Sequence, residues 1–454
     1  MFATAFHKTG ISGNMVFTDL AASMALVQLR QEREEREHNR VNSIAAGDRP
    51  YAGKQGEWDH PCSPIDFDDP EQQTKTQAYA DCCYYMKYAL AAYGWPLLML
   101  MHIGTGLCRM VPDCRCCACC RTHRTPDDDC LECNTSAVLY QTGLSRDDII
   151  HITCHNKAYR PPFFVSVDRT KRAVVVSIRG TLSISDALTD VTAEAVSFEH
   201  TAGTLHAHRG IFKAAKYVKT QVEQHNSGES CILDRAFEYA KEVDPNGDYK
   251  LVVVGHSLGG GTASILSLLF VLERSYPGLL CFAYSPPGGL LSLPAVEITK
   301  EFTTSVVLGK DLIPRLSLEK TYQLLNNMMA ETQRTLSPKW LIQLKCFCAC
   351  CCRCQSCQRD ETIEREKESE APHGDNANGT GYCMAEGRLA CPPLYTPGNI
   401  IYITAFPEDK KSYRAYWTDY KEFHTVFVGA AMVGDHLAHN VYDALQALNP
   451  DKDV

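Results

Sequence analysis

The sequence predicts an α/β fold in which a mostly parallel central sheet carries helices on both faces. Residues 251–254 are apolar and mostly β-branched, as expected of a strand buried on both faces, and a glycine-rich turn and an apolar stretch of helical length follow them. Further apolar runs of strand length occur at 173–178, 279–284, 304–308 and 399–404. Strands that alternate with helices in this way favour a parallel sheet.

Residues 1–135 are predicted to form a helical, cysteine-rich region close to a membrane. An amphipathic segment at 17–40 ends in a run of mixed charges, which is typical of a solvated helix end, and residues 51–75 are polar enough to form a loop. A second helical segment is expected at 78–101. It overlaps an uncharged stretch at 88–107 that a proline, a histidine and three glycines interrupt, so we expect a buried or interfacial segment rather than a membrane span.

The 23 cysteines of the chain gather mainly in two clusters, at 108–133 and 346–357. Cysteines so close together cannot all form disulfides within their own cluster. The first residues lack the pattern of a signal peptide, and we therefore expect a reducing environment. We interpret the first cluster as a site of S-acylation or membrane contact. A metal site, for which the spacing is poor, and ordinary loop cysteines are the alternatives.

The catalytic domain is predicted to comprise residues 136–345 and 384–450. Residues 163–168 and 173–178 have the pattern of two strands joined by a charged turn, and they predict a hairpin. The segment 182–198 is amphipathic and directly follows the second of these strands. We expect it to form a short helix that acts as an interfacial lid, with an ordinary surface helix as the alternative.

Three further features concern this domain and the segment that interrupts it. A helical pattern runs from residue 208 to about 242 and is interrupted near 226–228. Residues 346–383 begin with the second cysteine cluster, a further candidate for S-acylation or membrane contact, and continue with polar and charged residues. They are predicted to form a mobile, regulatory-type insertion between the two parts of the domain. The last helical segment carries both His436 and His439.

The turn after the strand at 251–254 reads Gly-His-Ser-Leu-Gly and contains Ser257. A G-x-S-x-G sequence between a buried strand and a helix is typical of a nucleophile elbow, since its glycines permit a turn too sharp for a Cβ atom. The first N–H groups of the helix can also hold negative charge. We predict that Ser257 is a nucleophile, and that backbone N–H groups of Leu258 and Thr181 form an oxyanion hole. The alternative is a glycine-rich turn with an uninvolved serine.

A serine nucleophile requires a base and a carboxylate that orients the base. Asp311 follows the strand at 304–308, at the sheet edge where reactive groups of parallel sheets collect. It is predicted to be the acid, with a helix N-cap as the alternative. In α/β-hydrolases the histidine comes last in the chain. The late candidates are His424, His436 and His439, and periodicity does not decide between the last two.

Composition narrows the classes of function. The formal net charge of −9 argues against a nucleic-acid partner, and no stretch resembles a nucleic-acid module. Serine ester hydrolysis needs no cofactor, and we expect no cofactor or metal site for the chemistry.

Several strings resemble class 3 (fungal-type) lipases, and sn-1-specific diacylglycerol lipases in particular. They are GHSLGGG at 255–261, RGTLS at 179–183, CFAYSPPGGLLS at 281–292, VVLGKDLIPRLSL at 306–318 and PPLYTPGNII at 392–401. The resemblance covers nearly the whole chain. It implies an α/β-hydrolase fold with Ser257 as nucleophile, Asp311 as acid and His436 as base, because Asp435-His436-Leu437 matches the pattern of the family.

The resemblance also implies a function. We expect a serine lipase that hydrolyses the sn-1 ester of diacylglycerol to 2-monoacylglycerol, of the 2-arachidonoylglycerol type, and a fatty acid. Its expected location is the cytosolic face of the plasma membrane. Calcium dependence is implied as well, although the sequence contains no aspartate-rich calcium loop.

Relatives of this kind carry four transmembrane helices ahead of the lipase region, and this chain has none. We expect a fragment, an incomplete gene prediction, or a form that its apolar segment and cysteine clusters hold on membranes. Alternatives to the function are a broader triacylglycerol lipase or phospholipase A1 with the same triad, a non-catalytic lipid-binding protein, and metal sensing by the cysteine clusters.

Overall fold

The computed structural model describes residues 17–42, 63–110, 128, 131–181, 195–200, 203–225, 230–273, 276, 278–334, 392–406 and 412–449. Several predictions lie outside these residues. They are the lid at 182–194, the loop at 51–62, the insertion at 346–383 and the first cysteine cluster apart from its end residues Cys108 and Cys133. The domain boundaries drawn from the sequence stay predictions.

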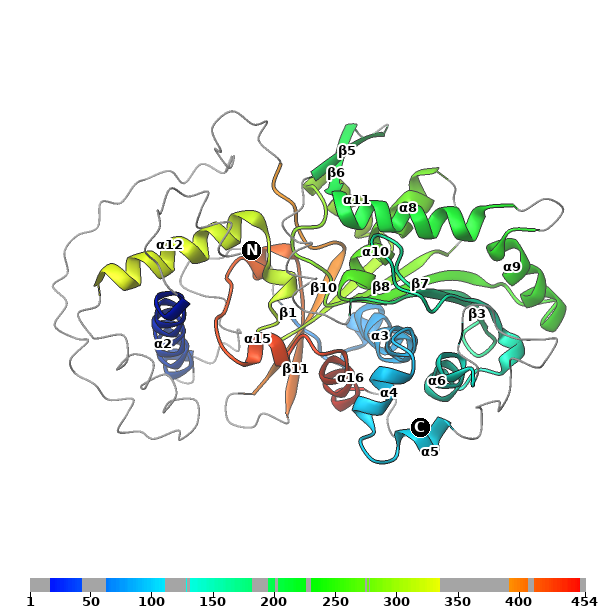
Figure 1. Cartoon of the computed structure of the whole chain (residues 1–454), viewed down its shortest axis with the longest axis horizontal. Coiled ribbons are helices and arrows are strands. Elements are labelled where there is room, and N and C mark those ends of the chain that lie inside the picture. Colours follow the sequence, from blue (N-terminus) through cyan, green and yellow to red (C-terminus); the bar gives the residue numbers. More distant parts are fainter. Residues whose placement is uncertain are drawn as a thin grey trace.

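A sheet of nine strands forms the centre of the described structure (Figure 1). Its order is β1-β11-β10-β9-β8-β7-β4-β3-β2. The strands are β1 Ser63–Pro64, β2 Ile149–Ile152, β3 Phe163–Asp168, β4 Ala173–Ile178, β7 Lys250–His256, β8 Leu280–Tyr284, β9 Thr303–Leu308, β10 Asn399–Ala405 and β11 Tyr413–Thr418.

The strands are parallel at the centre and antiparallel at both edges. β4, β7, β8, β9 and β10 pair in parallel. The predicted hairpin of β3 and β4 is confirmed as an antiparallel pair, and β2, β11 and β1 extend the two edges antiparallel. The prediction of a mostly parallel sheet is therefore correct for the centre, where helical crossovers connect the strands.

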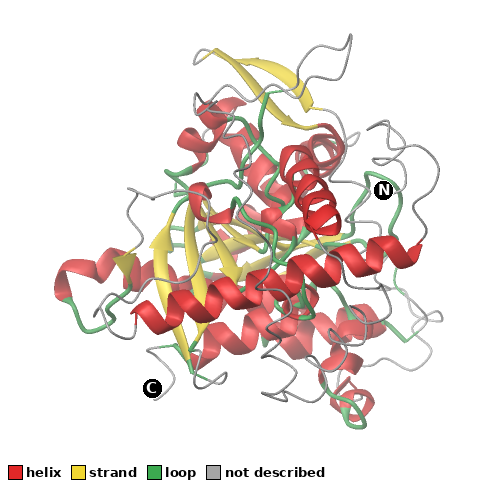
Figure 2. Ribbon diagram, turned by 90° about the vertical axis from the view of Figure 1, so that its left-hand side faces the viewer, coloured by secondary structure: helices red, strands yellow, loops and turns green. Residues whose placement is uncertain are grey.

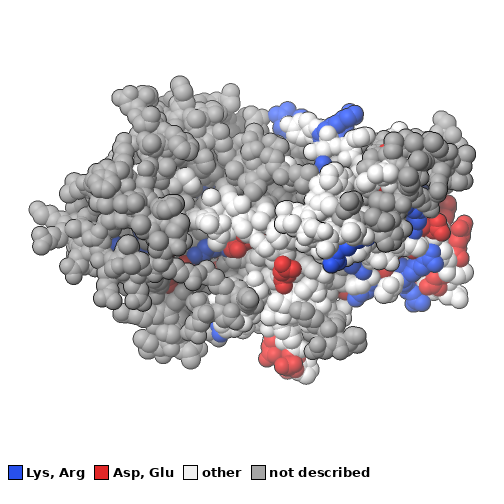
Figure 3. Space-filling model, turned by 60° about the horizontal axis from the view of Figure 1, so that its bottom comes forward, with Lys and Arg blue, Asp and Glu red and all other residues white. Residues whose placement is uncertain are grey.

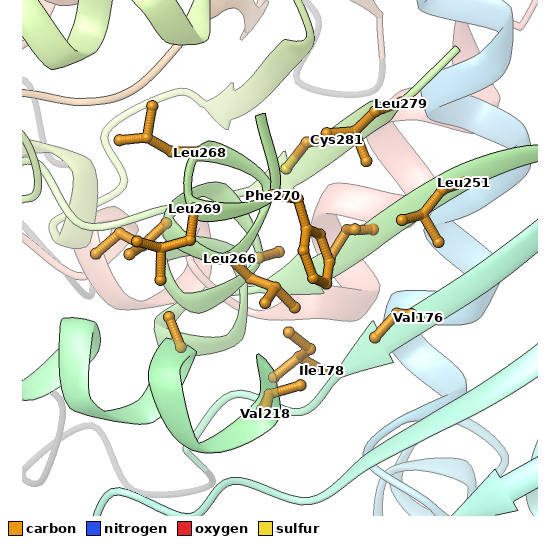
Figure 4. Close-up of a cluster of buried hydrophobic side chains, with 14 of the residues drawn as sticks. Val176, Ile178, Val218, Leu251, Leu266, Leu268, Leu269, Phe270, Leu279 and Cys281 are labelled. Carbon is orange, nitrogen blue, oxygen red and sulfur yellow. The ribbon is translucent and has the colours of Figure 1, made fainter. Parts of the chain in front are cut away.

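Helices cover one face of the sheet with a large apolar core (Figure 4). These are α8 Arg209–Glu223, α9 Ile232–Val243, α10 Leu258–Glu273 and α11 Leu293–Thr299. In this core, Leu266 and Phe270 of α10 belong to the same buried cluster as Ile178 of β4, Leu251 of β7 and Val218 of α8. The predicted helix from residue 208 to about 242 is confirmed as two helices, α8 and α9, with a break where the sequence placed one.

The opposite face is covered by α3 Gln73–Ala91, α4 Trp95–Met101, α6 Cys133–Thr142 and α16 Ala438–Ala447. The sequence predicted one helix over 78–101. Instead, Gly94 adopts φ 67° between α3 and α4, and Pro96 stands in the first turn of α4, so the chain changes direction there. Most of α3 is buried in the core. Within the described residues, no helix combines the length and apolarity needed to cross a bilayer.

Two helices extend the molecule beyond β11 and β10. α2 Phe17–Asn42 confirms the amphipathic helix predicted at 17–40, and it contacts α12 Leu318–Arg334 through a small apolar cluster that includes Val27 and Leu325. Figure 2 shows this end of the molecule, with the two helices crossing in front of the sheet. On the face presented in Figure 3, charges of both signs are scattered over the described surface, with a mixed group at its right-hand end.

A separate hairpin of β5 Ala195–His200 and β6 Gly203–His208 stands above α8 and α11 (Figures 1 and 2). Its ring contact with the body joins Phe198 to Phe212 of α8, with ring centroids 5.1 Å apart. The prediction of a helix over 182–198 is therefore wrong for residues 195–198, which pair with β6. Alternation of exposed and half-buried side chains along β5 is the period of a strand, not of a helix.

Candidate active site

Ser257 occupies a sharp turn between β7 and α10. Its φ of 59° is in the left-handed region, a conformation that costs a residue with a Cβ about 1–3 kcal/mol. Its N–H donates a hydrogen bond to the carbonyl of Tyr284 on the adjacent strand β8, at 2.8 Å. A Cβ added to Gly255 would collide with the backbone of Gly259. The glycines are therefore required by the close approach of the strand to the helix.

Asp311 lies just beyond the end of β9 and is fully buried. Its Oδ1 accepts a hydrogen bond from the N–H of Ile313 at 2.9 Å, and this N–H opens the short turn Ile313–Arg315. The same carboxylate lies 2.9 Å (Oδ1) and 3.1 Å (Oδ2) from Nδ1 of His436. The carboxylate thus holds the turn and the imidazole together, but the N-cap position of the turn belongs to Leu312, so Asp311 is not the helix N-cap of the alternative interpretation.

His436 connects the other two residues. Its Nε2 lies 2.9 Å from Oγ of Ser257, and its side chain is buried. The predicted shared helix is wrong, since His436 lies in a turn between α15 Ala431–Gly434 and α16, whereas His439 belongs to α16. His424 is directed elsewhere, with Nδ1 2.8 Å from the carbonyl of Lys421.

The contacts define a direction of proton transfer. With the hydrogen of His436 on Nδ1, the imidazole donates to the carboxylate of Asp311, and Nε2 is free to accept the hydroxyl hydrogen of Ser257. Such a nucleophile, base and orienting carboxylate can carry out acyl transfer.

The two predicted oxyanion donors belong to segments that lie next to the nucleophile. Leu258 is the first residue of α10 and directly follows Ser257. A Cβ added to Gly180, after β4, would lie 3.2 Å from Cβ of Ser257. Thr181 directly follows Gly180, so the predicted second donor is adjacent in sequence to a residue that closely approaches Ser257. The oxyanion role of both residues stays a prediction.

Comparison with known proteins places part of the chain in a sequence family. Residues 175–321, which contain Ser257 and Asp311, match the sequence model of the class 3 lipases. The fold is that of a class 3 lipase. The matched domain is thus that of a carboxylic ester hydrolase. The Rhizomucor miehei lipase propeptide complex is similar at 14% identity and a TM-score of 0.41, over 87% of this chain and 93% of the other.

Two curated relatives extend the similarity beyond the matched domain. Diacylglycerol lipase-alpha of Rattus norvegicus is 38% identical over 391 residues, 81% of this chain and 36% of the relative. Diacylglycerol lipase-beta of Mus musculus is 32% identical over 479 aligned positions, 100% of this chain and 65% of the relative. This chain therefore spans only part of the length of these relatives.

The site also contains contacts that the sequence did not point to. Nδ1 of His256, the residue before the nucleophile, lies 2.8 Å from the hydroxyl of Tyr93, and its Nε2 lies 2.9 Å from the carbonyl oxygen of His436. Asp435 accepts a hydrogen bond from the N–H of Lys310. His256 was visible inside the motif, but no spacing connects it with Tyr93, which enters from the turn after α3.

One group in the described residues brings three possible metal ligands together, namely His225, Cys231 and Asp234, near the start of α9. Sγ of Cys231 already accepts the N–H of Asp234 at 3.4 Å as a helix cap. Burial raises the pKa of the Cys231 thiol, which disfavours the thiolate that a metal would need. Calcium prefers oxygen ligands, so this group does not fit the calcium ion that the resemblance implied.

Proposed function

We propose that this chain is a serine lipase that hydrolyses the sn-1 ester of diacylglycerol, giving a 2-monoacylglycerol, of the 2-arachidonoylglycerol type, and a free fatty acid. The observation that carries the proposal is the continuous contact from Oγ of Ser257 through His436 to Asp311 at distances of 2.9 Å. The diacylglycerol substrate is taken from the names of the relatives described above.

The proposed reaction has two steps. His436 takes the proton of Ser257 as Oγ attacks the ester carbonyl, and Asp311 stabilises the imidazolium that forms. The glycerol oxygen leaves with that proton, and an acyl-enzyme remains on Ser257. Water, activated by His436, then releases the fatty acid. N–H groups of Leu258 and Thr181 are the proposed donors to the oxyanion in both steps.

The test uses diacylglycerol labelled in either the sn-1 or the sn-2 acyl chain, presented in mixed micelles to wild type and Ser257→Ala. We expect release of the sn-1 label by the wild type, loss of this release in the variant, and little release of the sn-2 label. If the wild type hydrolyses only triacylglycerol or phospholipid, the proposed triad stands but the proposed diacylglycerol substrate is wrong. Absence of both hydrolysis and fluorophosphonate labelling would favour the non-catalytic lipid-binding alternative.

We also propose that the enzyme works while bound to the cytosolic face of a membrane, with the plasma membrane as the expected one. Three large apolar side chains between residues 95 and 103 are exposed, namely Trp95 (42%), Leu100 (56%) and Ile103 (84%). Exposed Cys108 follows on α5 Gly106–Met110, as the S-acylation proposal requires. Exposed aromatic and aliphatic side chains this close in sequence favour contact with lipid.

A further inference from the structure

We propose that His256 is a neutral positioning residue, which holds the backbone of the base His436 in place and is itself kept in the required tautomer by Tyr93. The inference rests on the proposed role of His436 as the base. His256 forms two hydrogen bonds at once, to the carbonyl oxygen of His436 at 2.9 Å and to the hydroxyl of Tyr93 at 2.8 Å.

The chemistry of the partners determines where the hydrogen lies. A backbone carbonyl oxygen only accepts, so Nε2 of His256 must carry the hydrogen and donate it to His436. In a neutral imidazole Nδ1 then bears a lone pair. The hydroxyl of Tyr93 must therefore donate to Nδ1. Burial raises the pKa of Tyr93, which keeps this hydroxyl protonated.

The surroundings keep His256 uncharged. The side chain is buried, and this burial is the main cause that lowers the pKa of His256 well below its usual range. Repulsion from His436 and His439 lowers the same pKa further. His256 has both nitrogens occupied, so it has no free nitrogen with which to serve as a base. It acts on the reaction through His436.

The position of His256 in the chain gives these bonds their effect. His256 is bonded covalently to Ser257, and it anchors the carbonyl of His436, whose side chain must reach Oγ of Ser257 across 2.9 Å. The two imidazole rings lie 4.9 Å apart. Nucleophile and base are thereby tied together at the backbone as well as at the side chain. Without the hydrogen bond from Tyr93, His256 can take the other tautomer, and its Nε2 lone pair would then face the carbonyl of His436.

The decisive variant is Tyr93→Phe, and Tyr88→Phe is its matched control. Tyr88 lies one and a half turns earlier, is also buried, and donates its hydroxyl hydrogen to Asp168 at 2.7 Å, away from Ser257. Both variants lose one buried hydrogen bond, but only Tyr93→Phe loses the bond to His256. We expect a 10- to 100-fold lower kcat with little change in KM for Tyr93→Phe, since small misplacements of reacting groups have effects of that size. Tyr88→Phe should retain the kcat of the wild type.

A second pair of variants separates positioning from folding. His256→Gln retains an amide that can donate to His436 and accept from Tyr93, whereas His256→Leu can do neither. We expect substantial activity in the glutamine variant and little in the leucine variant, when both are compared at equal folded fraction. Equal losses in Tyr93→Phe and Tyr88→Phe, or equal losses in the two His256 variants, would overturn the proposal.

The tautomer can be measured without any substrate. Imidazole ¹⁵N spectra of the resting wild type should show one histidine that stays neutral, with its hydrogen on Nε2, at pH values where exposed histidines are protonated, and Tyr93→Phe should change that signal. A His256 with its hydrogen on Nδ1 would refute the proposal even in an active lipase. Conversely, the expected spectrum from a protein that hydrolyses no ester would refute the proposed function and leave the geometry standing.

Discussion

The carboxylate of Asp435 accepts a hydrogen bond of 2.7 Å from the backbone N–H of Lys310. It thereby joins the turn that precedes Asp311 to the turn that carries His436. Gly309 is part of this junction, because it has a φ of 45° and a Cβ there would collide with the Asp435 carboxylate. The acid and the base are thus connected by a second carboxylate that does not touch the imidazole in the contacts described above.

The first prediction is that the carboxylate of Asp435 makes the stability of the protein depend on pH. Burial, followed by the charge of Asp311, raises the pKa of Asp435 to about 6. Because the folded state holds the proton more tightly than the unfolded state, the contribution of Asp435 to stability is present below about pH 4 and is lost as the pH rises through about 6. Asp435→Asn retains an oxygen for the N–H of Lys310 and removes the titration. We expect a free energy of unfolding about 1–3 kcal/mol higher than wild type at pH 8, and no such gain at pH 4.

Urea unfolding at both pH values measures this difference directly. A gain of equal size at pH 4 and pH 8 would show that the amide improves packing and that the carboxylate does not titrate as described.

The second prediction concerns the three residues in contact. Ser257→Ala should abolish fluorophosphonate labelling and lipid hydrolysis. Asp311→Asn should lower kcat by about 10³–10⁴, because an amide can hold His436 in the wrong tautomer. His424→Gln is the control, since His424 contacts Lys421 and not Ser257. Retention of activity in Asp311→Asn, with a folded protein by circular dichroism, would assign the acid to another residue.

Gly180 supports a third prediction, on stability and activity together. A Cβ at this position would collide with the carbonyl oxygen of His256 and the hydroxyl of Tyr93. Gly180→Ala should therefore destabilise the protein by about 1–3 kcal/mol and displace the residues around Ser257. Gly434→Ala is the matched change in open space, where alanine should be neutral or mildly stabilising. Thermal unfolding of the two variants tests the contrast, and equal melting temperatures would contradict it.

Prediction from the sequence succeeded where one local pattern carried the information. The strand, turn and helix around Ser257, the hairpin of β3 and β4, and the break between α8 and α9 all follow from periodicity and turn residues. It failed where a long-range partner decided the structure. Ala195–His200 forms a strand because β6 pairs with it. Periodicity also left His436 and His439 undecided, since the difference depends on where α15 ends, and only the resemblance favoured His436. No local pattern could connect Tyr93 with His256, which are 163 residues apart.

The last prediction tests the proposed membrane contact. Leu100 and Ile103 are exposed on α4 and the turn after it, whereas Val271 of α10 and Leu293 of α11 are apolar side chains exposed to 37% elsewhere. Replacing Leu100 and Ile103 together by serine removes two large apolar side chains from the proposed surface. Replacing Val271 and Leu293 by serine is the control, because it removes two exposed aliphatic side chains outside the proposed surface.

We expect the Leu100→Ser/Ile103→Ser variant to lose sedimentation with phosphatidylcholine vesicles by 10-fold or more, since each buried aliphatic side chain contributes about 1.5–3 kcal/mol. Its hydrolysis of a short-chain ester in solution should be unchanged, because neither side chain contacts Ser257, Asp311 or His436 in the bonds described. The Val271→Ser/Leu293→Ser control should bind vesicles like the wild type. If both double variants lose binding equally, attachment reflects general apolarity. If neither does, the surface that holds the lipid lies elsewhere on the chain.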